Sequence, residues 1–280
     1  VRNEGDMDLH IDAITLPAGY SLVEGLAEIL APGASDTFTI QMDTATAGIQ
    51  SGWVRIANND ADKNTFDYSV TGEVFAVEVI EDNSAHLKNE KDGLVIVSLT
   101  GPGTLNIYSS ESQPDRIENI VLTDTTDKSS LSIKTKGDAY AVVGSIFING
   151  SLGKLSTKET RIENAIIATG GIEALLLDDL AGTIIVSTDA SVEQGIVLVA
   201  DDIGSGAVFD FSGPVRLFRA GTYPSGSLSA GCLRDVVIKE GNFAVDVTAS
   251  AGSVLNLRAA GDITGDILAM NKVGQVKTPQ

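Results

Sequence analysis

The chain has 280 residues, of which 43% are hydrophobic and 29 are glycine; 38 acidic residues against 19 basic ones give a net charge of −19. This hydrophobic content excludes a disordered chain, and the acidic balance disfavours nucleic acid and anionic membranes as partners. The single cysteine, Cys232, excludes an intrachain disulfide. Apolar runs are far shorter than a membrane span, so membrane insertion is not expected.

Residues 1–75 are predicted to form short β-strands. Apolar and polar residues alternate with period two in four segments, 8–13, 37–42, 53–56 and 66–71. Turn signals separate these segments at Pro17-Ala18-Gly19, Pro32-Gly33 and Asn58-Asn59-Asp60. Period-two alternation places each apolar set on one face of a sheet, as in a two-sheet sandwich.

Several phrases in this region resemble bacterial immunoglobulin-like (Ig-like) repeats called choice-of-anchor D or ASH-like domains. Asn3-Glu4-Gly5, the segment 30–38 (LAPGASDTF) and the segment 51–56 (SGWVRI) are similar to the typical segments of that family, in the same order. The resemblance covers about a quarter of the chain. It implies an Ig-like β-sandwich over 1–75, with its first strand truncated, that serves as a spacer or interaction module in long exported proteins.

Residues 76–92 have a different character. Acidic residues crowd this stretch without a strong period, at Glu78, Glu81, Asp82, Glu90 and Asp92. We interpret the stretch as an acidic linker or an entry segment. It is the expected site of first cleavage in limited proteolysis, because such backbone is exposed.

From residue 93 to residue 280, short apolar strands recur between Gly, Asn, Asp and Ser. The phrase Ile117-Glu118-Asn119 is echoed at Ile162-Glu163-Asn164, and Asp178-Asp179 is echoed at Asp201-Asp202. Because the first offset is nearly twice the second, the echoes indicate a coil of about 22–23 residues, which suits a parallel β-helix. The predicted fold class is therefore all-β, an Ig-like sandwich followed by a parallel β-helix (β-solenoid).

The second region also resembles the β-strand-repeat segments of large bacterial surface proteins. The resemblance is carried by Gly101-Pro102-Gly103-Thr104-Leu105 and by the segment 143–150 (VGSIFING), and it implies a solenoid stalk. The chain begins without Met and ends without a closing element, so both ends look cut from a longer protein. The expected location is extracellular or at the cell surface. The expected partners are neighbouring domains of the same long chain, with glycans or surface proteins in addition.

A catalytic set is hard to assemble from this sequence. The two histidines, His10 and His86, are interpreted as exposed surface residues, and Cys232 as a buried inert thiol. One cysteine and two distant histidines do not make a zinc site. No nucleophile elbow and no dinucleotide or phosphate-binding glycine pattern is present. We therefore expect no cofactor and a protein that is not an enzyme.

Carboxylates offer the remaining chemistry. Asp60, Asp62 and Asn64 alternate in a loop and could present oxygens to Ca²⁺, but the full EF-hand pattern is absent and an ordinary polar hairpin loop is the favoured interpretation. The pairs Asp178-Asp179 and Asp201-Asp202 would lie one coil apart, about 4.8 Å from each other. Three interpretations stay open for them: solvated turns, a structural Ca²⁺ site, or a centre like that of β-helix polysaccharide lyases.

The lyase alternative needs a basic residue beside the aspartates, and Arg216, Arg219 and Arg234 are the candidates. Trp53, the only tryptophan, is placed by alternation on the outer face of its strand. It either shields a cross-strand neighbour or contacts a partner. The functional expectation is a non-catalytic structural or adhesive segment of a secreted or cell-surface bacterial protein, with a carbohydrate-active or glycan-binding β-helix as the alternative.

Overall fold

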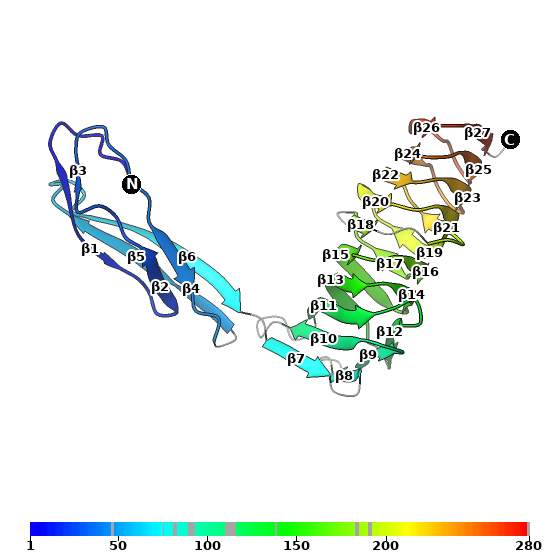
Figure 1. The fold of residues 1–280 in the computed structure, drawn as a ribbon, viewed down its shortest axis with the longest axis horizontal. Helices are drawn as coiled ribbons and strands as arrows, with labels where there is room; N and C mark the ends of the chain where they lie inside the picture. Colours follow the sequence, from blue (N-terminus) through cyan, green and yellow to red (C-terminus); the bar gives the residue numbers. More distant parts are fainter. Residues whose placement is uncertain are drawn as a thin grey trace. The chain divides into compact units, whose positions relative to one another are not determined.

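The computed structural model describes residues 1–45, 48–74, 76–80, 83–88, 93–109, 116–137, 139–182, 185–189 and 192–278. Every regular element in these ranges is a β-strand (Figure 1), so the all-β prediction is confirmed. The chain divides into two compact units. The first is Val1–Ala76, and the second contains Val77–Ser109 and the described residues from 116 to 278.

The N-terminal unit contains two small antiparallel sheets. The first has the strand order β3-β1-β5-β6 and the second pairs β2 with β4. Their bounds are β1 Leu9–Thr15, β2 Tyr20–Glu24, β3 Ile29–Leu30, β4 Thr39–Met42, β5 Gly48–Asn58 and β6 Thr65–Val74. The buried Asn3 side chain donates hydrogen bonds to the carbonyl oxygens of Met7 and Leu30, each at 2.8 Å. It thereby ties the first segment of the chain to β3.

Alternation in this unit follows the prediction in β5 and departs from it in β1. Val54 and Ile56 are fully buried, while Trp53 and Arg55 are exposed. In β1, a bulge after Ile11 shifts the register. Ala13 is therefore exposed, and Ile14 takes the inward place that Ala13 was predicted to have. The all-β prediction holds here, and the specific Ig-like sandwich stays a prediction.

The second unit is a parallel β-solenoid of about seven turns, as predicted. We call its two columns of stacked strands ladder A and ladder B (Figure 1). Ladder A consists of β11 Arg116–Thr125, β13 Ala141–Gly150, β15 Thr160–Ala168, β17 Asp179–Leu180, β18 Ile185–Thr188, β20 Ala207–Phe211, β22 Ser225–Ala230, β24 Ala244–Ala249 and β26 Ile267–Ala269. Ladder B consists of β12 Ser130–Lys136, β14 Leu152–Thr157, β16 Ile172–Leu176, β19 Ile196–Ile203, β21 Val215–Thr222, β23 Leu233–Ile238, β25 Val254–Ala259 and β27 Val273–Lys277.

Inward apolar side chains stack from coil to coil along both ladders. In ladder B the stacked residues are Leu131, Leu155, Leu175, Leu198, Phe218, Val236, Leu257 and Val276. All but Val276 are fully buried. The sequence separation of these partners is greatest between Leu131 and Leu155 and smallest between Phe218 and Val236. The predicted constant coil length is thus corrected to a variable one, because turns of different lengths join strands that keep their register.

The two sequence echoes correspond to real coil steps. Ile117 pairs with Val143 and Val143 pairs with Ile162, so the first echo spans two coils. Asp179 pairs with Asp202, so the second echo spans one. Degenerate repeats of this kind are expected where only inward positions and turns are constrained.

Antiparallel strands close the N-terminal end of the solenoid. β9 (Leu94–Thr100) pairs with β12 of ladder B and with β8 (Ser84–Lys88). β10 (Thr104–Ser109) pairs with β11 of ladder A and with β7 (Ala76–Ile80).

Strands β7 and β8 lie inside the stretch interpreted as a linker or entry segment. Because Ala85 of β8 is buried in the solenoid core, this part of the stretch is an entry segment and not a free linker. Four of the acidic residues that marked the stretch lie outside the described residues, namely Glu81, Asp82, Glu90 and Asp92.

An aromatic cluster fills the middle of the solenoid core. Phe209 contacts Phe218 and Tyr223, with ring centroids 5.1 and 5.4 Å apart, and Tyr223 contacts Phe243 at 5.9 Å. The Tyr223 hydroxyl lies 2.7 Å from the carbonyl oxygen of Ala207 and 2.8 Å from that of Ser227. Burial raises the pKa of this phenol, and the hydrogen bonds that its hydroxyl donates to carbonyl oxygens stabilise the protonated form. The hydroxyl therefore stays protonated and satisfies backbone oxygens inside the core.

Candidate functional site

The paired aspartates lie at one corner of the solenoid, where β17 meets β19. Asp179 and Asp202 are register partners, and the amide of Asp201 donates to the carbonyl oxygen of Asp178 at 3.0 Å. Asp178 and Asp179 are half-buried, while Asp201 and Asp202 are exposed. The strand register therefore places the two aspartate pairs at equivalent positions on neighbouring coils, as predicted.

Each of three carboxylates at this corner has its own hydrogen-bond donor. Asp178 accepts from the amide of Thr160 at 2.9 Å, Asp179 from the hydroxyl of Tyr140 at 2.7 Å, and Asp202 from the hydroxyl of Thr222 at 2.9 Å. Partial burial raises the pKa of Tyr140, as do its hydrogen bond to Asp179 and the charges of the aspartates. Across the described ranges, no group of three or more His, Cys, Asp or Glu residues is arranged to hold a metal ion.

The loop between β5 and β6 uses Asp60 to close a turn. One Asp60 carboxylate oxygen accepts from the amides of Asp62 and Lys63, at 2.8 and 3.2 Å. The Asn58 amide donates to the carbonyl oxygen of Asn64 at 2.9 Å. These are the bonds of a polar hairpin loop. They engage the carboxylate of Asp60, one of the three candidate Ca²⁺ ligands in this loop.

The remaining candidate residues are dispersed over the molecule. Trp53 lies opposite Ser69 in the β5–β6 pair and is 55% exposed, on the outer face where alternation placed it. His10 in β1 and His86 in β8 are exposed. Cys232 is half-buried, which corrects the prediction of a buried thiol, and its Cβ lies against Gly252 of the next coil.

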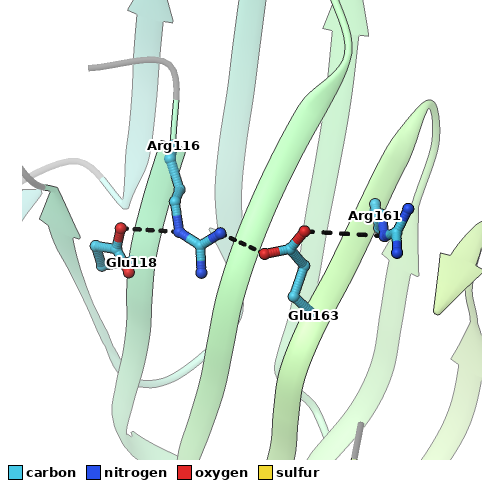
Figure 2. Close-up of polar contacts among 4 residues, drawn as sticks. All are labelled: Arg116, Glu118, Arg161 and Glu163. Carbon is cyan, nitrogen blue, oxygen red and sulfur yellow. Dashed lines mark hydrogen bonds and ion pairs between the residues drawn. The ribbon is translucent and has the colours of Figure 1, made fainter. Parts of the chain in front are cut away.

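A chain of alternating charges crosses three strands of ladder A (Figure 2). Arg116 of β11 contacts Glu118 of the same strand at 2.8 Å and also pairs with Glu163 of β15, which lies 3.9 Å from Arg161. Partial burial acts to lower the pKa of Arg116, but the hydrogen bonds and charges of Glu163 and Glu118 outweigh it and raise the pKa. The guanidinium is therefore held as a fixed cation between two carboxylates.

Gly144 of the intervening strand β13 makes this contact possible. A Cβ at Gly144 would lie 2.4 Å from the carbonyl oxygen of Glu118 and 3.2 Å from the Arg116 guanidinium. A side chain there would clash with the Glu118 carbonyl oxygen and press on the guanidinium that reaches Glu163. From the sequence, Ile117-Glu118-Asn119 and its echo are recognisable only as a repeat. The role of Gly144 could not be predicted, because it depends on the position of β13 between β11 and β15.

Cations gather on the outer face of ladder B, a feature that sequence reasoning missed. We define the cationic face as Arg216, Arg219, Arg234, Arg258 and Lys277, all exposed, on strands β21, β23, β25 and β27. Within these four described strands, Asp235 is the only carboxylate. The facing part of ladder A, strands β18, β20, β22, β24 and β26, carries Asp210 and Asp246 and no Lys or Arg.

The fold and these surfaces define a class, the parallel β-solenoid proteins, in which stacked coils present regular rows of side chains. Comparisons with protein-family models, with curated proteins and with solved structures each return no match. Within the described ranges, no helical segment has the length and apolarity needed to span a bilayer.

Proposed function

We propose that the chain is a non-catalytic structural or adhesive segment of a secreted or cell-surface bacterial protein. The observation that carries the proposal is the continuous inward stack of ladder B, from Leu131 to Val276, within a solenoid of about seven turns. Each coil adds about 4.8 Å of length and buries its apolar residues against the next. Such a stack is a scaffold that extends a surface, and a long acidic stack remains soluble outside the cell.

The N-terminal unit fits the same proposal. Its two small antiparallel sheets and its choice-of-anchor D phrases support an Ig-like spacer or interaction module. Trp53, more than half exposed on β5, is a natural contact for a neighbouring domain of the same long chain or for a surface protein.

The alternative is a carbohydrate-active β-helix with chemistry at the aspartate corner. The observation that favours it is the contact of β19 with β21, which places Asp202 beside Thr222 and Val199 beside Arg219 on the same strand pair. Asp178, Asp179 and Asp202 each accept a hydrogen bond from a different neighbouring donor. This arrangement disfavours a catalytic centre in which the three carboxylates surround one ion or one substrate.

A turnover assay separates the two functions. We expect the full chain, incubated with a panel of acidic and neutral polysaccharides plus Ca²⁺, to produce neither unsaturated nor reducing ends above a heat-inactivated control. New ends that form in proportion to protein and time, and that disappear in an Asp202→Asn variant, would contradict the non-catalytic function and establish the alternative.

A further inference from the structure

We propose that the cationic face of ladder B binds an extended polyanion that carries carboxylates, the chemistry of an acidic polysaccharide. This inference deepens the adhesive part of the proposed function and rests on it, whereas the spacer role does not depend on it. It is carried by the register of the strands, the exposure of the cations, and the lack of ion-pair partners, among the described residues, for four of the five cations.

Strand register aligns three of the cations in one outer column. Phe218, Val236 and Leu257 stack inside the core and are fully buried, so the residue after each one faces outward. Those residues are Arg219, Val237 and Arg258, and Lys277 continues the column as the register partner of Arg258. Arg258 and Lys277 are thus one strand spacing apart, about 4.8 Å, and Arg219 lies two spacings from Arg258.

A second column runs parallel to the first. Arg216 and Arg234 each follow an inward residue, Val215 and Leu233, which are register partners on neighbouring coils. Both arginines are exposed. Leu217, between the two columns on β21, and Val237, within the first column on β23, are half-buried and present apolar surface beside the cations.

These cations are largely without ion-pair partners of their own. Arg234 lies 3.6 Å from Asp235, whose carboxylate also accepts from Asn256 at 2.8 Å. For Arg216, Arg219, Arg258 and Lys277, no ion pair within 4.0 Å is formed with any described residue. Like charges one strand apart repel each other, and an anion bound between them relieves more of this repulsion than water and salt alone. In a protein of net charge −19, a face with five cations and one carboxylate is complementary to an external anion.

The arrangement favours a regular linear polymer. The first column runs along the solenoid axis over three strand spacings, roughly 14 Å, with a cation on three of its four strands, and the second column adds two arginines one spacing apart. A polysaccharide that carries a carboxylate on each sugar can place its charges along such a row and its C–H faces on Leu217 and Val237. Arginine, which makes up four of the five cations, binds carboxylates with two parallel hydrogen bonds. Single-stranded nucleic acid is disfavoured because the outer face of the described strands β21, β23, β25 and β27 carries no aromatic side chain on which bases could stack.

Binding of polygalacturonate, measured by isothermal titration calorimetry on the full chain, tests the proposal. The variant Arg219→Gln/Arg258→Gln/Lys277→Gln removes the first column. The control Lys63→Gln/Lys128→Gln/Lys158→Gln removes three exposed cations elsewhere and changes the net charge equally. We expect the column variant to bind about tenfold more weakly or worse, and the control to stay within about twofold of the parent. Binding should weaken as salt rises, and neutral dextran should not bind.

Each other outcome overturns the proposal. If the parent chain does not bind polygalacturonate, or if both variants lose affinity equally, the cationic face is not the site. Tighter binding of single-stranded DNA would assign a different class of ligand. Self-association in sedimentation velocity that is lost only in the column variant would make a second copy the occupant. Circular dichroism of both variants verifies the fold. Loss of binding contradicts only the adhesive role and leaves the spacer role standing, while the turnover assay separately tests whether the chain is non-catalytic.

Discussion

At the scale of single residues, polar groups in this protein are placed by constraints that lie on other coils. Gly144 lets Arg116 reach across β13 to Glu163, and the Tyr223 hydroxyl reaches the carbonyl oxygens of Ala207 and Ser227 inside the core. Neither the contact of Arg116 with Glu163 nor that of Tyr223 with Ala207 could be predicted from local sequence, because each joins coils whose alignment depends on turn lengths. The outward orientation of Trp53 and the exposure of His10 and His86 could be predicted, because local alternation and residue type are sufficient to indicate them.

The variant Tyr223→Phe tests the buried phenol. At neutral pH it should lower the free energy of unfolding by about 1–3 kcal/mol, because buried carbonyl oxygens lose their donor. The ordinary tyrosine pKa is 10.0 and burial raises it in the folded state. The stabilising contribution is therefore complete below pH 10 and is lost as pH rises toward the folded-state pKa, because the unfolded chain releases the proton first.

Urea unfolding followed by circular dichroism between pH 7 and pH 11 measures this effect. The parent chain should lose stability more steeply above pH 10 than the Tyr223→Phe variant, and the two curves should run parallel below pH 9. Equal slopes above pH 10 would show that this hydroxyl is already exposed to solvent in the folded state.

At the scale of elements, period-two alternation predicts strands well, but coil length is poorly predicted from degenerate repeats. The two sequence echoes led to the correct solenoid and to the correct pairing of Asp179 with Asp202. A fixed coil length nevertheless fails to align most other register partners, because the sequence separation of stacked residues in ladder B changes from one coil to the next. Arg219 and Arg258 reach one column through two coils of unequal length, so no regular repeat would have aligned them.

The aspartate corner gives the element-scale prediction. Because Asp178, Asp179 and Asp202 each accept a hydrogen bond from a different donor, we expect Ca²⁺ to raise the melting temperature no more than Na⁺ at matched ionic strength. The variant Asp178→Asn/Asp201→Asn should change stability by no more than about 0.5 kcal/mol, with a slight gain from reduced repulsion.

Differential scanning calorimetry with and without Ca²⁺ provides the measurement. A Ca²⁺-specific increase in melting temperature that the double variant abolishes would establish a calcium site. At a hundredfold excess of Ca²⁺ over the dissociation constant, the increase would correspond to about 2.7 kcal/mol of added stability. That result would also revive the lyase-like alternative, in which these aspartates hold the metal.

At the scale of the whole molecule, the C-terminal half of the solenoid separates charge between its two ladders. Strands of ladder A from β18 to β26 carry Asp210 and Asp246, and the strands of ladder B from β21 to β27 carry the cationic face. Net charge alone predicted only that nucleic acid and anionic membranes are disfavoured as partners. The separation emerges only when side chains are assigned to faces by strand register, and it is why the proposed ligand is an anion despite a net charge of −19.

Arginine labelling with phenylglyoxal, read by mass spectrometry with and without polygalacturonate, tests the proposed binding surface most directly. The polymer should slow the modification of Arg216, Arg219, Arg234 and Arg258, while Arg55 and Arg161, which are exposed elsewhere, should react at unchanged rates. Uniform protection of all six arginines, or protection of Arg55 and Arg161 in preference to the other four, would contradict ladder B as the binding surface.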